Sequence, residues 1–163
     1  MNQQTSEIFL FDFDGTIIDS SHRALSHSDG SINLDHWVEN CTRDKIFNDQ
    51  LLPLYEYARR LSYNGYDCFG ITARALTKHD WEFFFLYDLD KIFNKIYYRP
   101  TGCETKDSEL KAKQLRHFFN FKQYKDREKI FIDDNEGNRL ALEKMGATVY
   151  NPLNQDWVNS LSI

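Results

Sequence analysis

Short apolar, β-rich runs alternate along the chain with segments in which apolar residues recur at helical spacing. The runs predict five strands, at residues 8–13, 66–71, 95–99, 129–132 and 147–150. The segments between them predict helices, at residues 49–62, 77–92, 108–119 and 138–145. A capping box at Thr77 and Asp80 opens the second of these helices, and we expect its phenylalanine run 83–85 in the core. Strands separated by helices form βαβ units, so the pattern predicts an α/β fold with a doubly wound parallel sheet.

The segment 19–48 does not fit this alternation. It is rich in Ser, Asp, Asn and His, and its apolar residues are sparse. Plain connections in compact domains run about 4–6 residues, and much longer ones are commonly lids or binding loops. We therefore expect a single domain over residues 1–163, with a small cap or lid at about 19–48 inserted after the first strand and a short helix at 33–40 within it.

The chain carries 25 acidic and 20 basic side chains, which give a net charge of −5. Proteins that grip many phosphates along a duplex usually present a basic face, so this balance argues against such binding but allows a pocket for one phosphate. The apolar runs are far shorter than the ~18 residues of a membrane span, and the polar start of the chain lacks the basic region of a secretory signal. Three isolated cysteines favour reduced thiols over a zinc site or disulfides. We expect a soluble, cytoplasmic protein without membrane contact.

Polar side chains gather where the predicted strands end. The carboxyl ends of parallel strands form the ligand-binding edge of such a sheet, so we expect these side chains to lie together. A carboxylate can attack phosphorus, a second one can move a proton, Mg²⁺ prefers carboxylate oxygens, and a lysine with a hydroxyl can hold phosphoryl oxygens. In chain order the candidates are Asp12, Asp14, Thr72, Arg74, Asp107, Lys111, Asp133 and Asp134.

Some of these candidate residues also have a purely structural interpretation. Asp133 and Asp134 are alternatively caps of the next helix, together with Asn135. Asp107 and Lys111 stand four residues apart on a predicted helix, so they are alternatively a surface ion pair, or Asp107 orients the lysine. The five histidines show no metal-ligand spacing and are expected at the surface or in the cap.

The sequence FDFDGT at residues 11–16 resembles the first motif, DxDGT, of the haloacid dehalogenase superfamily of phosphatases. Thr72, Lys111 and the run Ile-Asp-Asp at 132–134 resemble the second, third and fourth motifs of that superfamily. The four motifs occur in the right order and extend over nearly the whole chain. The resemblance implies a Rossmann-like phosphatase fold.

It also implies roles for the motif residues. Asp12 is the nucleophile, and Asp14 is the acid/base, which also offers its backbone carbonyl to Mg²⁺. Thr72 and Lys111 bind the phosphoryl group. Asp133 completes the metal shell, and the sequence does not decide whether Asp134 binds directly or through water. The implied metal ligands are Asp12, Asp14, Asp133 and Asp134.

A narrower resemblance is to the 3′-phosphatase half of bacteriophage polynucleotide kinase-phosphatases. Arg23 stands eleven residues after Asp12, the sequence Thr-Ala-Arg at 72–74 takes the place of Ser-Gly-Arg, and the spacing from Arg99 to Lys111 is shared. The sequence has no P-loop (GxxxxGK[ST]), so the resemblance covers the phosphatase half alone. The substrate-binding residues that it implies are Thr72, Arg74, Arg23 and Asp107.

These features together predict a Mg²⁺-dependent phosphomonoesterase that acts through an aspartyl-phosphate. The favoured substrate is a 3′-phosphate on a nucleic-acid end or nucleotide. The alternatives are a 5′-nucleotidase and a phosphatase of another small phosphorylated metabolite. A regulatory protein, either a phospho-acceptor without turnover or a Mg²⁺-dependent binding module, is a third possibility, which Asp14 argues against because only turnover needs a second carboxylate. The sequence does not indicate an oligomeric state.

Overall fold

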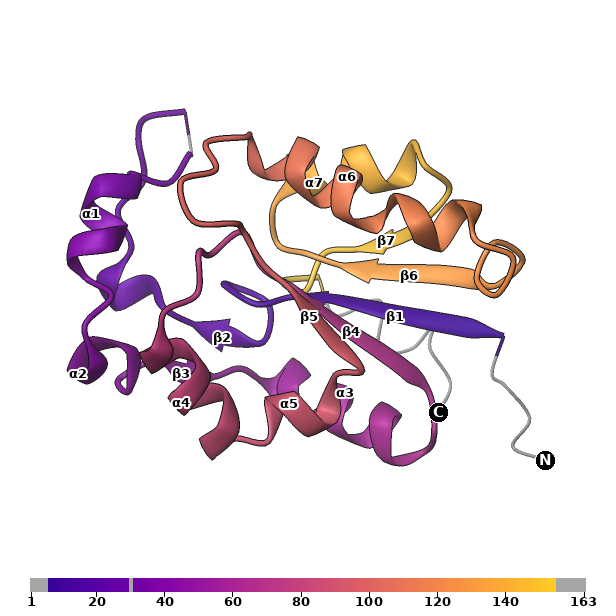
Figure 1. The fold of residues 1–163 in the computed structure, drawn as a ribbon, viewed down its shortest axis with the longest axis horizontal. Helices are drawn as coiled ribbons and strands as arrows, with labels where there is room; N and C mark the ends of the chain where they lie inside the picture. The colour runs from indigo at the N-terminus through magenta and orange to yellow at the C-terminus, as the bar shows by residue number, and fades with distance from the viewer. Residues whose placement is uncertain (1–5, 30, 155–163) are drawn as a thin grey trace.

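The computed structural model describes residues 6–29 and 31–154, and its centre is a five-stranded parallel sheet (Figure 1). All neighbouring strands pair in parallel. Each of the five predicted strands is present within one or two residues of its expected bounds, and the predicted doubly wound α/β architecture is confirmed. Across the sheet the strands are β5 (Lys95–Tyr97), β4 (Asp67–Ile71), β1 (Glu7–Asp12), β6 (Glu128–Ile132) and β7 (Thr148–Tyr150).

Helices cover both faces of this sheet, as a parallel sheet requires. One face packs against α3 (Pro53–Tyr63), α4 (Lys78–Leu86) and α5 (Leu89–Ile92) (Figure 1). The other face packs against α6 (Asp107–Asn120) and α7 (Glu136–Glu143). Within the described residues, no helix combines the length and the apolar character needed to cross a membrane.

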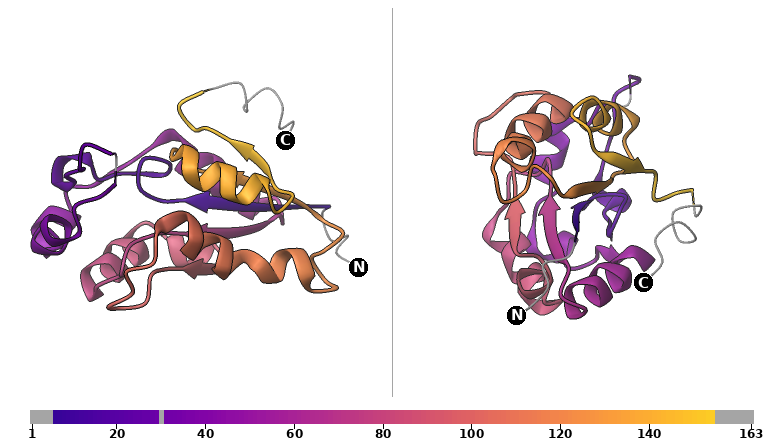
Figure 2. Two further views of the ribbon diagram at one scale, coloured as in Figure 1. Left: turned by 90° about the horizontal axis from the view of Figure 1, so that it is seen from above. Right: turned by 90° about the vertical axis from the view of Figure 1, so that its right-hand side faces the viewer.

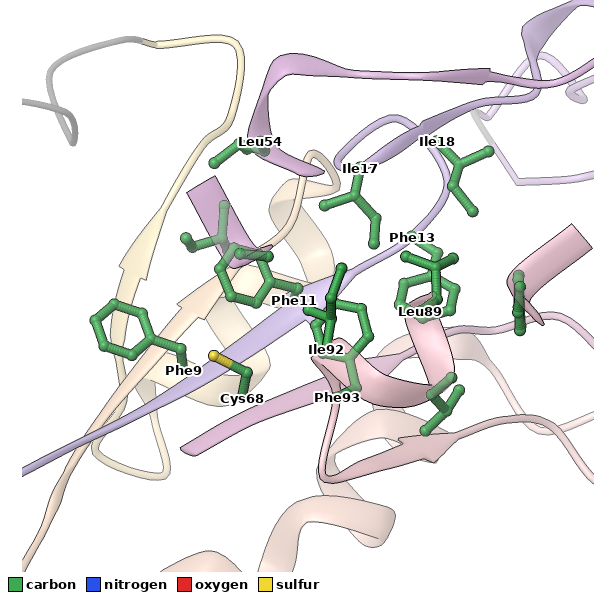
Figure 3. Packing of buried hydrophobic residues seen from close by; sticks show 14 of the residues in the cluster. Phe9, Phe11, Phe13, Ile17, Ile18, Leu54, Cys68, Leu89, Ile92 and Phe93 are labelled. Atoms are coloured by element: carbon green, nitrogen blue, oxygen red, sulfur yellow. The ribbon is translucent and has the colours of Figure 1, made fainter. Parts of the chain in front are cut away.

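The central strand β1 divides its side chains between the two faces. Phe9 and Phe11 point into the larger apolar cluster, on the side of α3 and α5 (Figure 3). Ile8 and Leu10 point into the second cluster, on the side of α6 and α7. Successive strand residues alternate between faces, so Asp12, at the end of β1, follows the row of Ile8 and Leu10 toward α6.

The segment between β2 (Ile18–Asp19) and β3 (Gln50–Leu51), named the cap segment from here on, extends beyond the carboxyl edge of the sheet (Figure 2). The two strands pair antiparallel, and between them lie η1 (Ser21–Arg23), α1 (Leu34–Glu39) and α2 (Arg43–Ile46). The side chain of Asn33 accepts a hydrogen bond from the backbone N–H of His36 and so caps α1. The short helix expected at 33–40 is therefore confirmed.

Two predicted helices differ from the structure, and one side chain was expected in the wrong place. The helix predicted from residue 49 begins at Pro53, because residues 50–51 pair with β2 and proline suits the first position of a helix. The helix predicted over 77–92 is interrupted at Asp88, whose φ of 56° is left-handed, and α4 and α5 are separate. Phe85 is 57% exposed, because three consecutive helical positions cannot all face one side.

Phe84 and Phe85 provide a test of this packing. Phe84 is fully buried and meets the ring of Phe13 edge-on, with ring centroids 5.2 Å apart. We expect Phe84→Ala to lower the free energy of unfolding by about 3–5 kcal/mol, because it removes a large ring and leaves a cavity. Phe85→Ala, one position along the same helix, should lower it by less than about 1 kcal/mol. Urea denaturation measures both values, and equal losses would contradict this orientation of α4.

Candidate active site

Lys111 joins the ends of two neighbouring strands. Its buried side chain extends from α6, and Nζ donates to Asp12 Oδ1 at 2.6 Å and to Asp133 Oδ2 at 2.7 Å. Asp12 ends β1, and Asp133 directly follows β6, the strand beside it. Burial would lower the pKa of Lys111, but the two carboxylates outweigh burial and raise that pKa, so the amine stays charged. Thr16 Oγ1 donates to the second oxygen of Asp12 at 3.1 Å.

Three carboxylates meet beside this amine. Oxygen atoms of Asp12, Asp133 and Asp134 all lie within 4.8 Å of one another, so negative charge exceeds the single charge of Lys111. Burial raises the pKa of Asp12 well above its ordinary value, and Asp133 raises it further against the effect of Lys111. Burial and the charge of Asp133 also raise the pKa of Asp134 to about 6. Hard oxygen donors with an excess of negative charge suit a divalent cation, so the residues present fit Mg²⁺.

Asp133 and Asp134 are held in different ways. The backbone N–H of Asn135 donates to Asp133 Oδ1 at 2.8 Å, and Asn138 Nδ2 donates to Oδ2 at 3.0 Å. Asp134 lies at the surface against Gly15, where a Cβ added to the glycine would stand 2.3 Å from Asp134 Oδ2. The side chain that caps α7 is that of Asn135, which accepts from the backbone N–H of Asn138. The two aspartates are therefore oriented toward the site, and their alternative role as the helix cap falls to Asn135.

The carboxylate of Asp14 is bound by Arg74. The guanidinium donates from Nε to Asp14 Oδ2 at 2.8 Å and from Nη2 to Oδ1 at 2.5 Å, and Ser20 Oγ also donates to Oδ1 at 2.5 Å. Burial would raise the pKa of Asp14, but the charge and hydrogen bonds of Arg74, with help from Ser20, hold it below its ordinary value. Asp14 is therefore an ionised carboxylate in this arrangement.

Arg23 and Arg74 both belong to a buried arginine–aspartate cluster, which comprises Arg23, Arg74, Asp14, Asp49 and Asp80. Arg23 donates from Nε and Nη2 to the two oxygens of Asp49, each at 2.8 Å. Arg74 donates from Nη1 to Asp80 at 2.9 Å and from Nη2 to Asp49 at 3.3 Å. Both arginines lie inside the fold, with 1% and 3% of their surface exposed. Their role in substrate binding stays a prediction.

Thr72 and Asp107 lie at the border of the site. Thr72 follows β4, is fully buried, and accepts at Oγ1 from the backbone N–H of Arg74 at 3.1 Å. Asp107 accepts from Arg99 Nη2 at 2.5 Å, and Arg99 Nε donates to the carbonyl oxygen of residue 73. Lys111 bonds to the strand-end carboxylates, so the alternative of an Asp107–Lys111 ion pair is wrong. Asp107 instead ties the start of α6 to the turn after β4, through Arg99.

Sequence reasoning misses Asp49 and Asp80. The predicted capping box is confirmed, with Asp80 Oδ2 accepting from the backbone N–H and Oγ1 of Thr77. The other oxygen of Asp80 accepts a hydrogen bond from Arg74, six residues earlier in the chain. The capping box already explains Asp80, so the short separation between the two residues is the only sequence feature that could have indicated this second contact. Asp49 is separated from Arg23 by 26 residues and from Arg74 by 25, and nothing in the sequence pairs it with either.

Sequence comparisons match the chain to 5′-deoxynucleotidases. The family model described as bacteriophage T5 5′-deoxynucleotidase matches residues 1–160 of the chain. The curated 5′-deoxynucleotidase of Escherichia phage T5 is 40% identical over 81 residues, which are 47% of this chain and 33% of that protein. The matched segment thus spans only about a third of the length of that relative.

Solved structures share the fold at low sequence identity. A haloacid dehalogenase-like hydrolase from Streptococcus pneumoniae has a TM-score of 0.62 at 16% identity, over 91% of this chain and 85% of that chain. A chain of the Pnkp1/Rnl/Hen1 RNA repair complex has a TM-score of 0.59 at 17% identity, over 93% of this chain and 44% of that chain. A D,D-heptose 1,7-bisphosphate phosphatase from B. bronchiseptica, in complex with magnesium and phosphate, has a TM-score of 0.54 at 11% identity, over 90% and 80%. The predicted haloacid dehalogenase-type fold is confirmed.

The contact between Gly15 and Asp134 generates a prediction about the carboxylate group. Gly15 has a φ of +76°, and Gly65, at the end of α3, has a φ of +84° with open space around its Cα. Either glycine replaced by alanine should lose about 1–2 kcal/mol of stability, because an L-residue is strained in this region. Only Gly15→Ala also displaces the Asp134 carboxylate, so only this variant should need more Mg²⁺ for half-maximal thermal stabilisation.

Thermal unfolding across a Mg²⁺ titration measures both effects, and Gly65→Ala serves as the matched control for backbone strain. An unchanged Mg²⁺ requirement in Gly15→Ala would show that the position of Asp134 does not matter for the cation.

Proposed function

The chain belongs to the bacteriophage T5 5′-deoxynucleotidase family, and from this membership we propose that it is a Mg²⁺-dependent phosphomonoesterase that removes the phosphate from 5′-deoxynucleotides. The observation that carries the proposal is the contact of Lys111 with Asp12 and Asp133 at the carboxyl edge of the sheet. It brings together a buried carboxylate, a fixed ammonium group and further oxygen ligands. The shared fold with haloacid dehalogenase-type phosphatases supports the same reaction.

In the first step, a carboxylate oxygen of Asp12 attacks the phosphorus atom. The bond from Asp12 to phosphorus forms while the bond from phosphorus to the 5′ oxygen breaks, which yields an aspartyl-phosphate and the free nucleoside. Lys111 and Thr72 bind non-bridging oxygens of the phosphoryl group, where negative charge develops in the transition state. Their burial supports this role, because hydrogen bonds to charge are stronger away from water.

The proposed Mg²⁺ ligands are Asp12, the backbone carbonyl of Asp14, and Asp134. Asp133 is fully buried and accepts three hydrogen bonds, from Lys111, Asn135 and Asn138, so we assign it to holding Lys111, with the exposed Asp134 as the more accessible ligand of the pair. When bound, Mg²⁺ supplies Lewis-acid stabilisation of the phosphoryl oxygens. The magnesium and phosphate in the D,D-heptose 1,7-bisphosphate phosphatase support this choice of cation.

Asp14 moves a proton in each step. In its protonated form it gives a proton to the 5′ oxygen as the nucleoside leaves, and the resulting carboxylate then takes a proton from the water that attacks phosphorus and releases Asp12, which restores the protonated form. The ionised Asp14 beside Arg74 is the form that the second step requires. A phospho-acceptor without turnover has no use for this carboxylate, so its presence supports hydrolysis.

Free 5′-deoxynucleotides are favoured over nucleic-acid ends for two reasons. The curated relative is a 5′-deoxynucleotidase, and a net charge of −5 suits a small anion bound at one point better than a polyanion. The 3′-phosphatase hypothesis depends on Arg23 and Arg74, and Asp14, Asp49 and Asp80 engage these guanidinium groups inside the fold. It remains the competing outcome of the substrate test below.

The nucleophile is tested by Asp12→Asn. The amide keeps the volume of the side chain but cannot attack phosphorus, so hydrolysis of thymidine 5′-monophosphate should fall to the background rate while the chain stays folded. EDTA should abolish the activity of the wild-type protein, and added Mg²⁺ should restore it. Full turnover by Asp12→Asn, with deamidation excluded by mass spectrometry, would rule out the covalent mechanism.

The substrate is tested by comparing kcat/KM for thymidine 5′-monophosphate, thymidine 3′-monophosphate and a 3′-phosphorylated oligonucleotide. We expect the 5′-monophosphate to be preferred by at least about tenfold, which corresponds to a difference of ~1.4 kcal/mol in transition-state binding. A preference for either 3′-phosphate would support the 3′-phosphatase hypothesis instead, and the phosphatase assignment would stand.

A further inference from the structure

Asp49 is a buried carboxylate shared by two arginines. Its Oδ2 accepts from Arg23 Nη2 at 2.8 Å and from Arg74 Nη2 at 3.3 Å, and its Oδ1 accepts from Arg23 Nε and contacts His22 Nε2, each at 2.8 Å. Its side chain is fully buried, while that of His22 is 38% exposed. Nothing in the DxDGT motif or in the strand-end pattern marks this residue.

The backbone fixes Asp49 close to Asp14. Asp49 immediately precedes β3, which pairs with β2, and β2 follows the turn that begins at Asp14. Gln50 lies opposite Asp19, and the next residue, Ser20, donates to the carboxylate of Asp14. The hydrogen bond from Gly15 N–H to the carbonyl of residue 18 closes the turn. Asp49 therefore belongs to the same rigid unit as the proposed proton donor.

The arginine–aspartate cluster holds two positive and three negative charges, so it has one carboxylate more than its arginines need. Arg23 and Arg74 carry two positive charges, and Asp49 and Asp80 carry two negative charges, all of them buried. A buried charge without a partner is costly, whereas a balanced set is tolerated. Asp14 is thus the additional carboxylate that Arg74 holds. Its side chain is 24% exposed, whereas those of Asp49 and Asp80 are buried, so Asp14 is the carboxylate free to move, and its departure leaves a neutral set behind as long as Asp49 and Asp80 keep their charges.

We propose that Asp49 is a positioning residue for proton transfer: by sharing the charge of Arg74, it holds that guanidinium in place and allows the Asp14 side chain to leave it and, in its protonated form, to donate to the oxygen of the leaving group. The inference rests on the proposed phosphatase function. Without the charge of Asp49, the two arginines would need Asp14 as their second counter-ion. Asp14 would then stay on Arg74, and delivery of the proton would slow.

The same contacts connect the cap segment to Asp14. Arg23 lies in η1, and Trp37, in α1, covers its guanidinium with the ring centroid 4.2 Å from Arg23 Cζ. The ring also lies 5.2 Å from Arg74 Cζ. Asp49 bonds both to Arg23, in the cap segment, and to Arg74. The position of the cap segment therefore affects how Arg74 binds the carboxylate of Asp14.

The test compares Asp49→Asn with wild type on two substrates that differ in their need for a proton. Thymidine 5′-monophosphate releases a poor leaving group, whereas p-nitrophenyl phosphate releases a stable anion. We expect kcat for the nucleotide to fall by about 10- to 10²-fold, as when a proton donor worth 10²–10⁴-fold is misplaced. We expect kcat for p-nitrophenyl phosphate to fall by less than about threefold, because little proton transfer is needed. In an Asp14→Asn background, Asp49→Asn should not change the ratio of the two rates further.

Asp67→Asn is the matched control. Asp67 pairs with Arg127 at 2.7 Å at the amino end of β4, so the variant loses an arginine–aspartate ion pair, here a partly exposed one, at the opposite edge of the sheet, and both rates should stay unchanged. Circular dichroism and thermal unfolding check that Asp49→Asn is folded. If it is not, Arg74→Lys tests the same link, because a lysine keeps the charge but cannot bond to Asp14, Asp49 and Asp80 together. It should show the same loss selective for the nucleotide.

Equal losses on both substrates, or no loss on either, would overturn the positioning role and leave the phosphatase assignment intact. A wild-type protein that hydrolyses neither substrate in Mg²⁺ would overturn the proposed function, and this inference with it.

Discussion

The site depends on the two hydrogen bonds from Lys111 to Asp12 and Asp133. Neighbouring strands of a sheet lie about 4.8 Å apart, so carboxylates at the ends of β1 and β6 are forced close together. Two buried carboxylates without a cation between them cannot both remain ionised. Lys111 supplies that cation from α6, whose start is fastened to the turn after β4 through Asp107 and Arg99. The helix therefore places a positive charge between two carboxylates that the sheet alone could not stabilise in their ionised forms.

The strand order separates two charged groups around β1. On the side of β6, Lys111 faces more carboxylates than it can neutralise, and this excess favours a divalent cation. On the side of β4, the arginine–aspartate cluster is close to neutral. The DxDGT sequence contributes Asp12 to the first group and Asp14 to the second. The two carboxylates, two residues apart, thereby obtain opposite pKa shifts: burial and Asp133 raise that of Asp12, and Arg74 lowers that of Asp14.

The sequence predicts those parts of the fold and site that depend on strand period and strand ends. Asp12 is placed by the alternation of β1, and Thr72 and Asp133 follow strands that short apolar runs locate within two residues. Exposure within a continuous apolar run is not predictable in this way, because the rotation of α4 about its axis decides that Phe85 faces solvent. Long-range ion pairs are also beyond sequence reasoning: Arg99, rather than Lys111, takes Asp107, and the fold of the cap segment brings Asp49 to Arg23 and Arg74.

The attachment of α1 has consequences that a hydrophobic contact would not have. This helix is six residues long and buries Trp37, while Leu34 and Val38 are 47% and 72% exposed. Such a short helix has little stability of its own, so its position depends on what Trp37 touches. The ring rests on the guanidinium groups of Arg23 and Arg74. Of the two helices of the cap segment, α2 packs into the main apolar cluster through Ile46, whereas α1 is held by the contact of Trp37 with charged side chains. Any rearrangement of those charges, including the departure of Asp14 from Arg74, therefore reaches α1 directly, without passing through the hydrophobic core.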